Sequence, residues 1–207
     1  MQLHSILPRA VACRVGEADA LLKWKASLEN QSQVFLSSWA GNNPYDNWVG
    51  ISCDSSQSVT NLTIQDSGLK GTLHSFNFPY LLIFDLFNNS LHGNIPTSIG
   101  NLSKLINLTL NNNQLFGHIP PEIGMLSNLQ VLDLAANDFS GSIPRQLGNC
   151  TGLLQLNMSY NMLSQSIPLE VRATRFLKEL DLSSNLLMKE IPKQFGKLRT
   201  LSSLNLS

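Results

Sequence analysis

The sequence predicts a repeat solenoid, with short strands stacked in parallel on one face and a helical cap over the N-terminal end. Three observations predict it. Asparagines recur at a step of 24 residues, prolines keep the same step, and leucines fill the positions between them. A fixed period of this length is typical of proteins in which each repeat buries its apolar side by stacking on its neighbours.

Residues 1–16 precede this pattern. The small residues Ala10, Val11 and Ala12 are typical of the cleavage region of a signal peptide, but Pro8 and Arg9 interrupt the apolar stretch that should come before it. We interpret this N-terminal segment as a degraded signal peptide.

Residues 17–57 are expected to cap the first repeat, because a terminal layer has no neighbour to cover it. Glu17 and Asp19 stand at the start of an amphipathic helix, where the helix dipole favours negative charge. Leu21, Leu22 and Leu28 share one face of that helix, which we expect to point inward.

Residues 58–207 hold about six repeats and a truncated seventh. Two leucine columns at a spacing of two residues place both on the inward face of a short strand. A proline that follows isoleucine ends each segment, because it cannot donate to a continuing ladder. A short helical or 3₁₀ turn should then cross the convex side, as over residues 97–105.

The recurring asparagine is polar but falls among inward positions. Its amide can both donate and accept, so we expect it to bond backbone groups at the strand ends and to form a buried ladder. The ladder comprises Asn89, Asn113, Asn137, Asn161 and Asn185.

Two repeats depart from the frame. In the first, Ser67 takes the place of asparagine, and the step to Asn89 is 22 residues. In a later repeat, Gln165 and Arg172 stand where other repeats have glycine, and Thr174 stands in a leucine column. We expect this later repeat to be locally the least stable.

The outward residues of the stacked strands should line a concave face, on which each repeat presents the same few positions. Exposed aromatic side chains on such a face are candidate anchors for a partner. The candidate ligand-binding residues are Asp85, Phe87, Thr109, Asn111, Asp133, Asn157, Ser159, Tyr160 and Asp181.

Eight N-x-S/T triplets indicate a glycosylated extracellular chain, although alternation of leucine with polar residues also generates such triplets. The candidate acceptors are Asn30, Asn61, Asn88, Asn101, Asn107, Asn149, Asn157 and Asn205. Glycans on Asn107 and Asn157 would obstruct the centre of the concave face.

Several function classes are excluded. The chain has 14 basic and 14 acidic residues, so no net charge favours nucleic acid, and no apolar run is long enough to insert into a membrane. Cys150 falls in an inward column, which predicts a buried apolar role. The histidines at positions 4, 74, 92 and 118 lack metal-ligand spacing. We therefore expect no metal, no cofactor and no catalytic residue.

Two motifs carry a specific resemblance. The G-x-I-P extension recurs at residues 93–96, 117–120 and 141–144, and the cap reads E-A-D-A-L-L-K-W-K followed by W-V-G-I-S-C. From about residue 17 to 207 the chain resembles the N-terminal ectodomain portion of plant leucine-rich-repeat receptor-like kinases. The resemblance implies an α/β repeat solenoid: a right-handed leucine-rich-repeat coil with a parallel β-sheet on its concave face.

The resemblance also implies a function. It predicts an extracellular module, secreted or on the outer side of the plasma membrane, that binds a peptide or protein ligand and a co-receptor in signal perception. The kinase and the membrane span of such receptors are absent from this sequence, so we expect no enzyme activity.

Relatives of this type carry a second cap cysteine shortly before the tryptophan, where this chain has residues 44–47, Pro-Tyr-Asp-Asn. Cys53 is thus expected to be unpaired unless it reaches Cys13, and loss of a cap disulfide costs about 2–5 kcal/mol. The seventh strand also begins just before Ser207. Two alternatives therefore stay open: a secreted inhibitor of a cell-wall-degrading enzyme, similar to polygalacturonase-inhibiting proteins, and an inactive truncated product.

Overall fold

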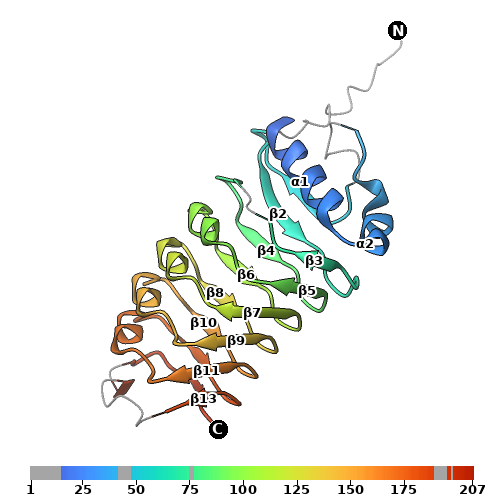
Figure 1. Ribbon diagram of the computed structural model, residues 1–207. Coiled ribbons are helices and arrows are strands. Elements are labelled where there is room, and N and C mark those ends of the chain that lie inside the picture. Colours follow the sequence, from blue (N-terminus) through green and yellow to red (C-terminus); the bar gives the residue numbers. More distant parts are fainter. Residues whose placement is uncertain (1–14, 42–47, 75–76, 189–194, 197) are drawn as a thin grey trace.

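The computed structural model describes residues 15–41, 48–74, 77–188, 195–196 and 198–207. The chain winds into a curved coil, with two helices over its N-terminal end and successive turns stacked side by side (Figure 1). Parallel sheets with few helices are the architecture that the repeat pattern predicts. The predicted signal peptide lies outside the described residues.

An eight-stranded sheet forms the concave face. Its strands pair in register and in parallel, because each turn presents the same three residues, and only the first pair is antiparallel. In spatial order the strands are β1 (Ile51–Cys53), β2 (Val59–Thr63), β4 (Ile83–Asp85), β6 (Asn107–Thr109), β8 (Val131–Asp133), β10 (Gln155–Asn157), β12 (Glu179–Asp181) and β14 (Ser203–Asn205).

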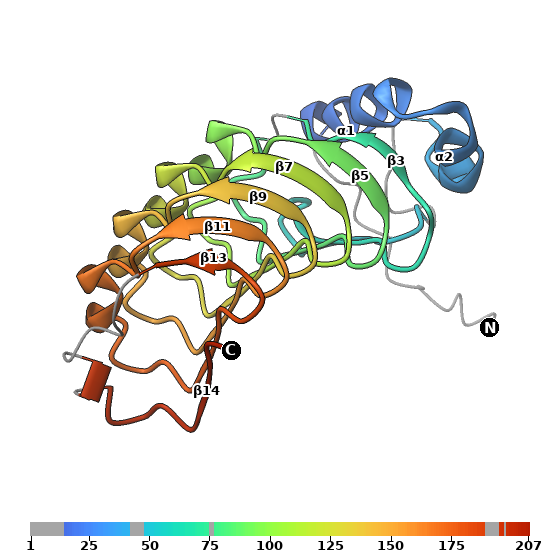
Figure 2. The same ribbon diagram turned by 60° about the horizontal axis from the view of Figure 1, so that its bottom comes forward.

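A second, six-stranded parallel sheet runs along the coil, and the sequence analysis missed it (Figure 2). Five of its six short strands begin directly after a ladder asparagine. Gly93, Gly117 and Gly141 at the strand ends have φ between 79° and 86°, a backbone region that glycine adopts without strain. The strands are β3 (Lys70–Thr72), β5 (Ser90–Gly93), β7 (Gln114–His118), β9 (Asp138–Gly141), β11 (Met162–Gln165) and β13 (Leu186–Leu187).

Short 3₁₀ helices form the convex side, as expected. Each follows a proline in extended conformation, which ends the preceding strand. Successive segments approach closely: a Cβ on Gly100 would lie 2.8 Å from the carbonyl oxygen of Glu122. The glycine column therefore sets the spacing of the turns. The segments are η2 (Thr97–Asn101), η3 (Pro121–Met125), η4 (Arg145–Asn149) and η5 (Leu169–Ala173).

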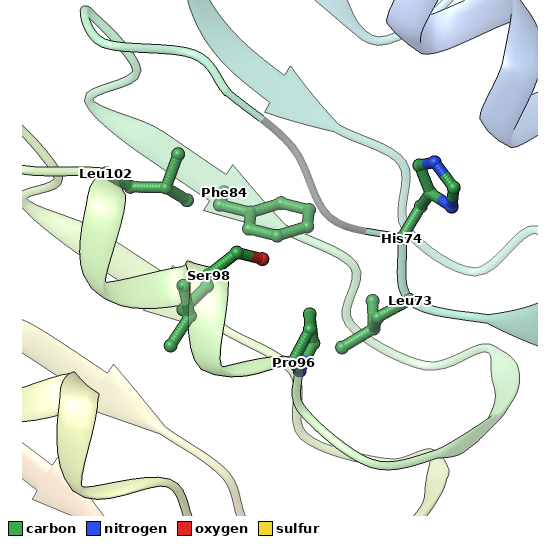
Figure 3. A pocket seen from close by; sticks show the side chains of 7 residues that line it. Leu73, His74, Phe84, Pro96, Ser98 and Leu102 are labelled. Atoms are coloured by element: carbon green, nitrogen blue, oxygen red, sulfur yellow. The ribbon is translucent and has the colours of Figure 1, made fainter.

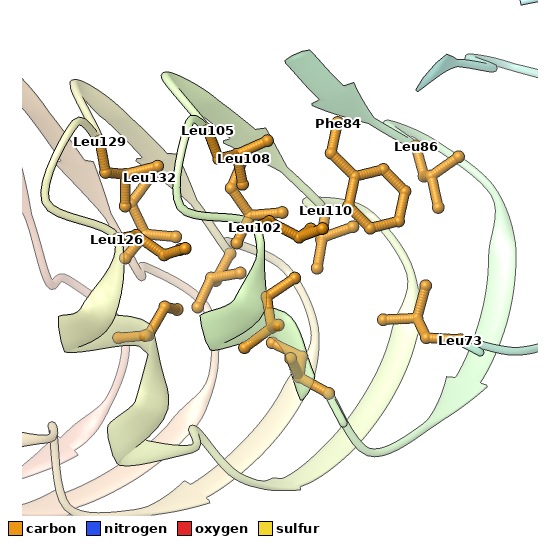
Figure 4. Packing of buried hydrophobic residues seen from close by; sticks show 14 of the residues in the cluster. Leu73, Phe84, Leu86, Leu102, Leu105, Leu108, Leu110, Leu126, Leu129 and Leu132 are labelled. Carbon is orange, nitrogen blue, oxygen red and sulfur yellow. The ribbon is translucent and has the colours of Figure 1, made fainter. Parts of the chain in front are cut away.

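The core is a stack of leucine layers (Figure 4). Leu102, Leu105, Leu108 and Leu110 of one turn are all at most 1% exposed, and the equivalent residues of the next turn pack against them. Full burial of such a side chain stabilises the folded state by about 1.5–3 kcal/mol. Every turn therefore contributes one layer, as the columns predict.

Three tryptophans hold the cap together. The cap helices are α1 (Val15–Ser27) and α2 (Asn30–Phe35), followed by η1 (Leu36–Ser38). The rings of Trp39 and Trp48 are stacked, with centroids 5.5 Å apart, and Trp24 lies 6.0 Å from Trp39. Each indole N–H donates to a backbone oxygen, so these large side chains are buried without an unpaired donor.

Glu17 has a role beyond starting the first helix. It is only 6% exposed, and its Oε2 accepts a 2.8 Å hydrogen bond from the backbone N–H of Val59 at the start of β2. This bond joins the cap to the first repeat. Sequence alone indicated only an acidic residue near a helix start, since the partner is 42 residues away.

Cys53 was expected to be unpaired unless it reached Cys13, and it is paired. Cys53 is disulfide-bonded, and its partner lies outside the described residues. Of the three cysteines in the sequence, Cys150 is free and buried, so it does not take part in this bond. Spacing in a sequence does not fix which cysteines meet in space.

The shortened 22-residue step leaves a defect in the core. No 3₁₀ helix occurs between β3 and β4 in the described residues, and an apolar hollow of about 10 Å³ lies there. Leu73 and His74 lie on one side of this hollow and Pro96, Ser98 and Leu102 on the other (Figure 3). A space of this size holds one water at most, so it is a packing defect rather than a ligand site.

Candidate ligand-binding face

Two outward columns cover the concave sheet. In each strand from β2 to β12 a leucine or phenylalanine is buried in the core, and its two neighbours point outward. The first column reads Asn61, Ile83, Asn107, Val131, Gln155, Glu179 and Ser203, and the second reads Thr63, Asp85, Thr109, Asp133, Asn157, Asp181 and Asn205. Neither column contains lysine or arginine, so the face carries only negative charge.

Local hydrogen bonds fix the carboxylates of the second column. Oδ1 of Asp133 accepts the backbone N–H of Ala135 at 3.0 Å, and Oδ1 of Asp181 accepts the N–H of Ser183 at 2.9 Å. Asp85 makes the same bond to Phe87. The bond is possible because the chain turns directly after each strand, which brings the N–H of the second following residue back to the side chain.

The second carboxylate oxygen of each aspartate is held by an amide of a neighbouring strand. Oδ2 of Asp133 accepts from Asn157 at 3.4 Å, and Oδ2 of Asp181 accepts from Asn205 at 3.2 Å. Gln155 and Glu179 form a further cross-strand pair at 2.9 Å. The polar side chains therefore form a connected array with fixed orientations, which lowers the entropic cost of binding a ligand.

Asp133 lies at the electrostatic centre of this array. Burial raises the pKa of its carboxyl above the ordinary 3.8, hydrogen bonds from Ala135 and Asn157 lower it, and the charges of Asp85 and Asp181 raise it again. The net shift is upward. A positive ligand group placed here would relieve this repulsion.

A shallow hollow of about 230 Å³ extends over four neighbouring strands of this face. It contains Asp133, Asn157 and Asp181 from the predicted set, together with Gln155, Glu179 and Ser203, which the predicted set omitted. The predicted set omitted these three residues because, of the two strand columns, it included only the second. The first column was available from the same leucine spacing.

The remaining predicted residues lie on or beside the same face. Thr109 and Asp85 belong to the second column on strands nearer the cap. Phe87, Asn111 and Ser159 follow the strands at the turn. Ser159 is only 4% exposed, Phe87 and Asn111 are half-buried, and the buried Oδ1 of Asn111 accepts no hydrogen bond from the described residues.

Tyr160 is exposed, as expected, but it stands at the edge of the face. It is 65% exposed, has φ of 52°, and lies in the turn between β10 and β11. Equivalent turn residues in the other repeats, such as Asn112 and Ala136, also have positive φ. Phe87 and Tyr160 therefore do not form a joint aromatic anchor on the concave strands.

The asparagine ladder lies behind the face and supports it. Oδ1 of Asn137 accepts the N–H of Leu115 at 3.0 Å, while its Nδ2 lies within hydrogen-bonding distance of three backbone oxygens. The other ladder residues, Asn89, Asn113, Asn161 and Asn185, make the same set of bonds. Each asparagine thus ties two successive turns together at the end of the concave strand.

The eight glycosylation candidates fall into two groups. Asn30, Asn88, Asn101, Asn149 and Asn205 are exposed. Asn61, Asn107 and Asn157 lie on the concave strands and are partly buried. The amide of Asn157 already bonds Asp133 and accepts from Ser159, so a glycan there would break the polar array.

Other residues with reactive side chains do not form a site. Cys150 is fully buried, its thiol lies 3.4 Å from the carbonyl of Ile123, and burial raises its pKa to about 11. A thiol with such a pKa stays protonated at neutral pH and is a poor nucleophile. Across the described ranges, no group of three or more His, Cys, Asp or Glu residues is arranged to hold a metal ion.

Comparisons with known proteins define the class. A family profile described as "Leucine rich repeat N-terminal domain" matches residues 16–54, and one described as "Leucine Rich Repeat" matches residues 80–102, 104–126, 128–150 and 176–198. MDIS1-interacting receptor like kinase 2 of Arabidopsis thaliana is 40% identical over 103 residues, which cover 46% of this chain and 10% of that protein.

Solved structures give the same result over more of the chain. The ectodomain of the Arabidopsis receptor kinase HAESA, in complex with an N-terminally extended IDA peptide hormone, is 34% identical with a TM-score of 0.84. The match covers 93% of this chain and 33% of that one. The Arabidopsis thaliana BIR3–SERK2 complex matches with 31% identity and a TM-score of 0.71, over 82% of this chain and 94% of that one.

These matches define a capped leucine-rich-repeat scaffold of the kind that serves as a ligand-binding ectodomain rather than an enzyme domain. The chain belongs to the family of plant leucine-rich-repeat receptor-like kinases and receptor-like proteins, and corresponds to the N-terminal portion of the ectodomain. It spans about a tenth of the length of the curated kinase relative and a third of the HAESA ectodomain chain.

Membership of this family places the chain on the extracellular or plasma-membrane side of the cell. Among the described helices, none has the length and apolar character needed to span a bilayer.

Proposed function

We propose that the chain recognises an extracellular polypeptide ligand through the hollow on strands β8, β10, β12 and β14, and that the ligand places a positively charged group beside Asp133 and Asp181. One observation carries this proposal: the hollow is lined by oriented carboxylates and amides and contains no basic residue. Charge complementarity of this kind selects partners and speeds their association.

An extended peptide suits this surface better than a compact small molecule. The hollow is shallow and crosses four strands, and its polar groups recur from turn to turn. A peptide that crosses the strands can meet the same column once per turn, at intervals of about 4.8 Å. The peptide-hormone complex of HAESA, a similar structure, supports this ligand class. A co-receptor could bind the same ectodomain beside such a peptide.

A peptide-library experiment tests the proposal. The chain is immobilised and exposed to random twelve-residue peptides, and the bound peptides are sequenced. We expect enrichment of lysine and arginine, and an affinity about tenfold lower or worse for the Asp133→Asn/Asp181→Asn variant, because each loses a charged partner. Asp19→Asn/Asp138→Asn is the matched control, since both residues are exposed and lie on α1 and on the second sheet. Unselected sequences, or equal binding by the variant, would overturn the proposal.

The pH dependence of binding provides a second readout. The raised pKa of Asp133 means that acidification neutralises this carboxylate sooner than an ordinary aspartate. Affinity for a cationic peptide should therefore fall as pH decreases through that raised value, and Asp133→Asn should flatten the profile.

The glycan pattern bears on the same site. We propose that the exposed acceptors Asn30, Asn88, Asn101 and Asn149 carry glycans in the secretory pathway, and that Asn157 and Asn205 do not, because their amides hold Asp133 and Asp181 at the hollow. Glycopeptide mass spectrometry of the secreted chain measures this directly. A fully occupied Asn157 would move the ligand site elsewhere.

A further inference from the structure

The neutral total charge conceals a basic segment. Residues 172–199 contain seven of the 14 basic residues and three of the 14 acidic ones, so the rest of the chain has seven basic and 11 acidic residues. The basic residues are Arg172, Arg175, Lys178, Lys189, Lys193, Lys197 and Arg199, and the acidic ones are Glu179, Asp181 and Glu190.

The fold places two of these acidic residues and three of the basic ones on opposite faces. Glu179 and Asp181 belong to β12 on the concave sheet, where they accept hydrogen bonds from Gln155 and Asn205. Arg172, Arg175 and Arg199 are exposed and line a hollow of about 690 Å³ on the convex side, next to η5. No carboxylate lines this hollow in the described part of the chain. Glu170, the acidic residue on η5, is exposed and is not among the lining residues.

The arginines stand at positions that other repeats fill with small residues. The column that contains Arg175 and Arg199 reads Ser103, Ser127, Thr151, Arg175 and Arg199. Arg172 stands in the column of Gly100, Gly124 and Gly148. The basic surface therefore begins in the turn that starts with β10. It does not follow from the repeat frame, because the equivalent positions of earlier turns hold small residues.

Two of the arginines are held one turn apart. The hydroxyl of Thr200 donates to the carbonyl oxygens of Arg175 at 2.9 Å and Leu177 at 2.8 Å, which fixes the segment of Arg199 against that of Arg175. Their backbones are therefore close neighbours, while the guanidinium groups carry like charges. A ligand with regularly spaced anionic groups would relieve this repulsion and accept paired N–H bonds from each guanidinium.

An aromatic ring adjoins the arginines in the chain. Phe176 directly follows Arg175 and is 60% exposed. The face of an exposed ring can stack on the C–H groups of a sugar, and arginine beside an aromatic ring suits a sugar that carries a carboxylate. A linear polysaccharide with a carboxylate on each sugar offers both kinds of group at regular intervals.

We propose that Arg172, Arg175, Phe176 and Arg199 form a binding site for a linear polysaccharide that carries carboxylate groups. This site, the convex basic surface, lies on the opposite side of the coil from the peptide hollow. The two sites are independent, so the loss of one leaves the other intact. The convex basic surface would let the ectodomain hold such a polysaccharide while its concave face stays open to a peptide.

The test uses the full chain and polygalacturonate oligomers of one length, with the methyl-esterified oligomer as the uncharged comparison. Binding is measured by calorimetry at two salt concentrations. We expect binding to the acid form only, and weaker binding at high salt because the contact is ionic.

Two variants with the same change in net charge locate the site. Arg172→Gly/Arg175→Thr/Arg199→Ser replaces each arginine by a residue type that occurs in the same column, so the fold should be preserved, and its affinity should fall at least about tenfold. Lys23→Gln/Lys104→Gln/Arg145→Gln removes three exposed charges elsewhere and should change affinity less than about twofold. Thermal unfolding of both variants checks folding.

Several outcomes would overturn the proposal. Equal binding of the esterified oligomer would exclude a carboxylate-reading site, and an equal loss in both variants would show only a general charge effect. Tighter binding to vesicles of phosphatidylserine and phosphatidylcholine than to polygalacturonate would assign the surface to a membrane instead. Loss of oligomer binding in Asp133→Asn/Asp181→Asn would contradict the independence of the two sites.

Discussion

Two kinds of turn share one 24-residue frame but fill it differently. One kind comprises the turns that begin at β4, β6 and β8, and the other is the turn that begins at β10, the fifth turn counted from β2. In the first three, here called the regular turns, glycine ends the second-sheet strand and glycine lies in the 3₁₀ segment. In the fifth turn, Gln165 and Arg172 take these places, and Thr174 is fully buried in a column that begins with leucine.

The difference shows which features of the frame are needed for stacking. Ladder, strand register and core layers continue through the fifth turn without a break. Gln165 keeps the positive φ of the glycines at 73°, and Thr174 satisfies its hydroxyl by donating to the carbonyl of Val171 at 2.6 Å. The fifth turn thus keeps the geometry at some cost in stability and introduces arginine on the convex side.

The largest expected effect comes from placing the fifth-turn residue in a regular turn. In Gly124→Arg, the new Cβ would lie 2.6 Å from Cβ and 2.7 Å from the carbonyl carbon of Gln146. The backbone of the next turn would have to move, so we expect a loss of roughly 3 kcal/mol or more in the free energy of unfolding. Arg172→Gly, the reverse change, should stay within about 1 kcal/mol of wild type. Urea unfolding measures both, and an unchanged midpoint for Gly124→Arg would contradict the close approach.

The ladder gives the next largest effect. In Asn137→Leu, the N–H of Leu115 and the backbone carbonyls that accept from the Asn137 amide lose their partner. We expect the free energy of unfolding to fall by about 3 kcal/mol. Asn185→Leu, in the turn that follows the fifth, should cost less because Asn185 is partly exposed and water can replace part of its bonding. Chemical denaturation ranks the two, and equal losses would show that burial does not set the cost.

A glycine in the fifth turn should improve it. Gln165→Gly removes the strain of a positive φ in a residue with a Cβ. We expect the free energy of unfolding to rise by about 0.5–1 kcal/mol. Ser164→Gly changes the neighbouring residue of the same strand and should not stabilise. Differential scanning calorimetry of the two variants decides whether backbone strain makes this turn the weaker one.

The smallest effect concerns pH. The regular turn has Asp133 where the fifth turn has the neutral Asn157. Because the folded-state pKa of Asp133 is raised, the folded chain binds its proton more tightly than the unfolded chain does. Asp133 therefore contributes a loss of stability as pH rises from 3.8 through the raised value. Asp133→Asn should remove this contribution from the curve of unfolding free energy against pH. An unchanged curve would contradict the burial of this carboxylate.

Much of the architecture could be predicted from the sequence, because the same pattern of apolar, polar and turn residues recurs every 24 residues. The inward leucines, the parallel strands and the 3₁₀ turns follow from spacing alone. The second sheet was missed because its strands, such as β5 and β7, carry a single buried apolar residue (Leu91 and Leu115), so no pair of leucines two residues apart marks them. The pairing of Cys53 stayed open in the sequence because it depends on distances between residues that a sequence does not give.

The candidate face was located in advance, but its chemistry was not. Alternation of leucine with polar residues identified Asp133, Asn157 and Asp181 as outward. Their hydrogen bonds to neighbouring turns, and the hollow that they share with Gln155 and Glu179, exist only because residues 24 apart are brought side by side.

By itself, the sequence determined the repeat, the core columns, the position of the cap and the side of each strand that faces outward, since these follow from periodicity in one dimension. Only the tertiary structure decided that Glu17 bonds Val59 across 42 residues and that successive turns approach too closely for a Cβ at Gly124. It also decided that Glu179 and Asp181 lie on the face opposite Arg172, Arg175 and Arg199. These depend on distances between turns, and charge counted along a chain carries no information about the direction in which each side chain points.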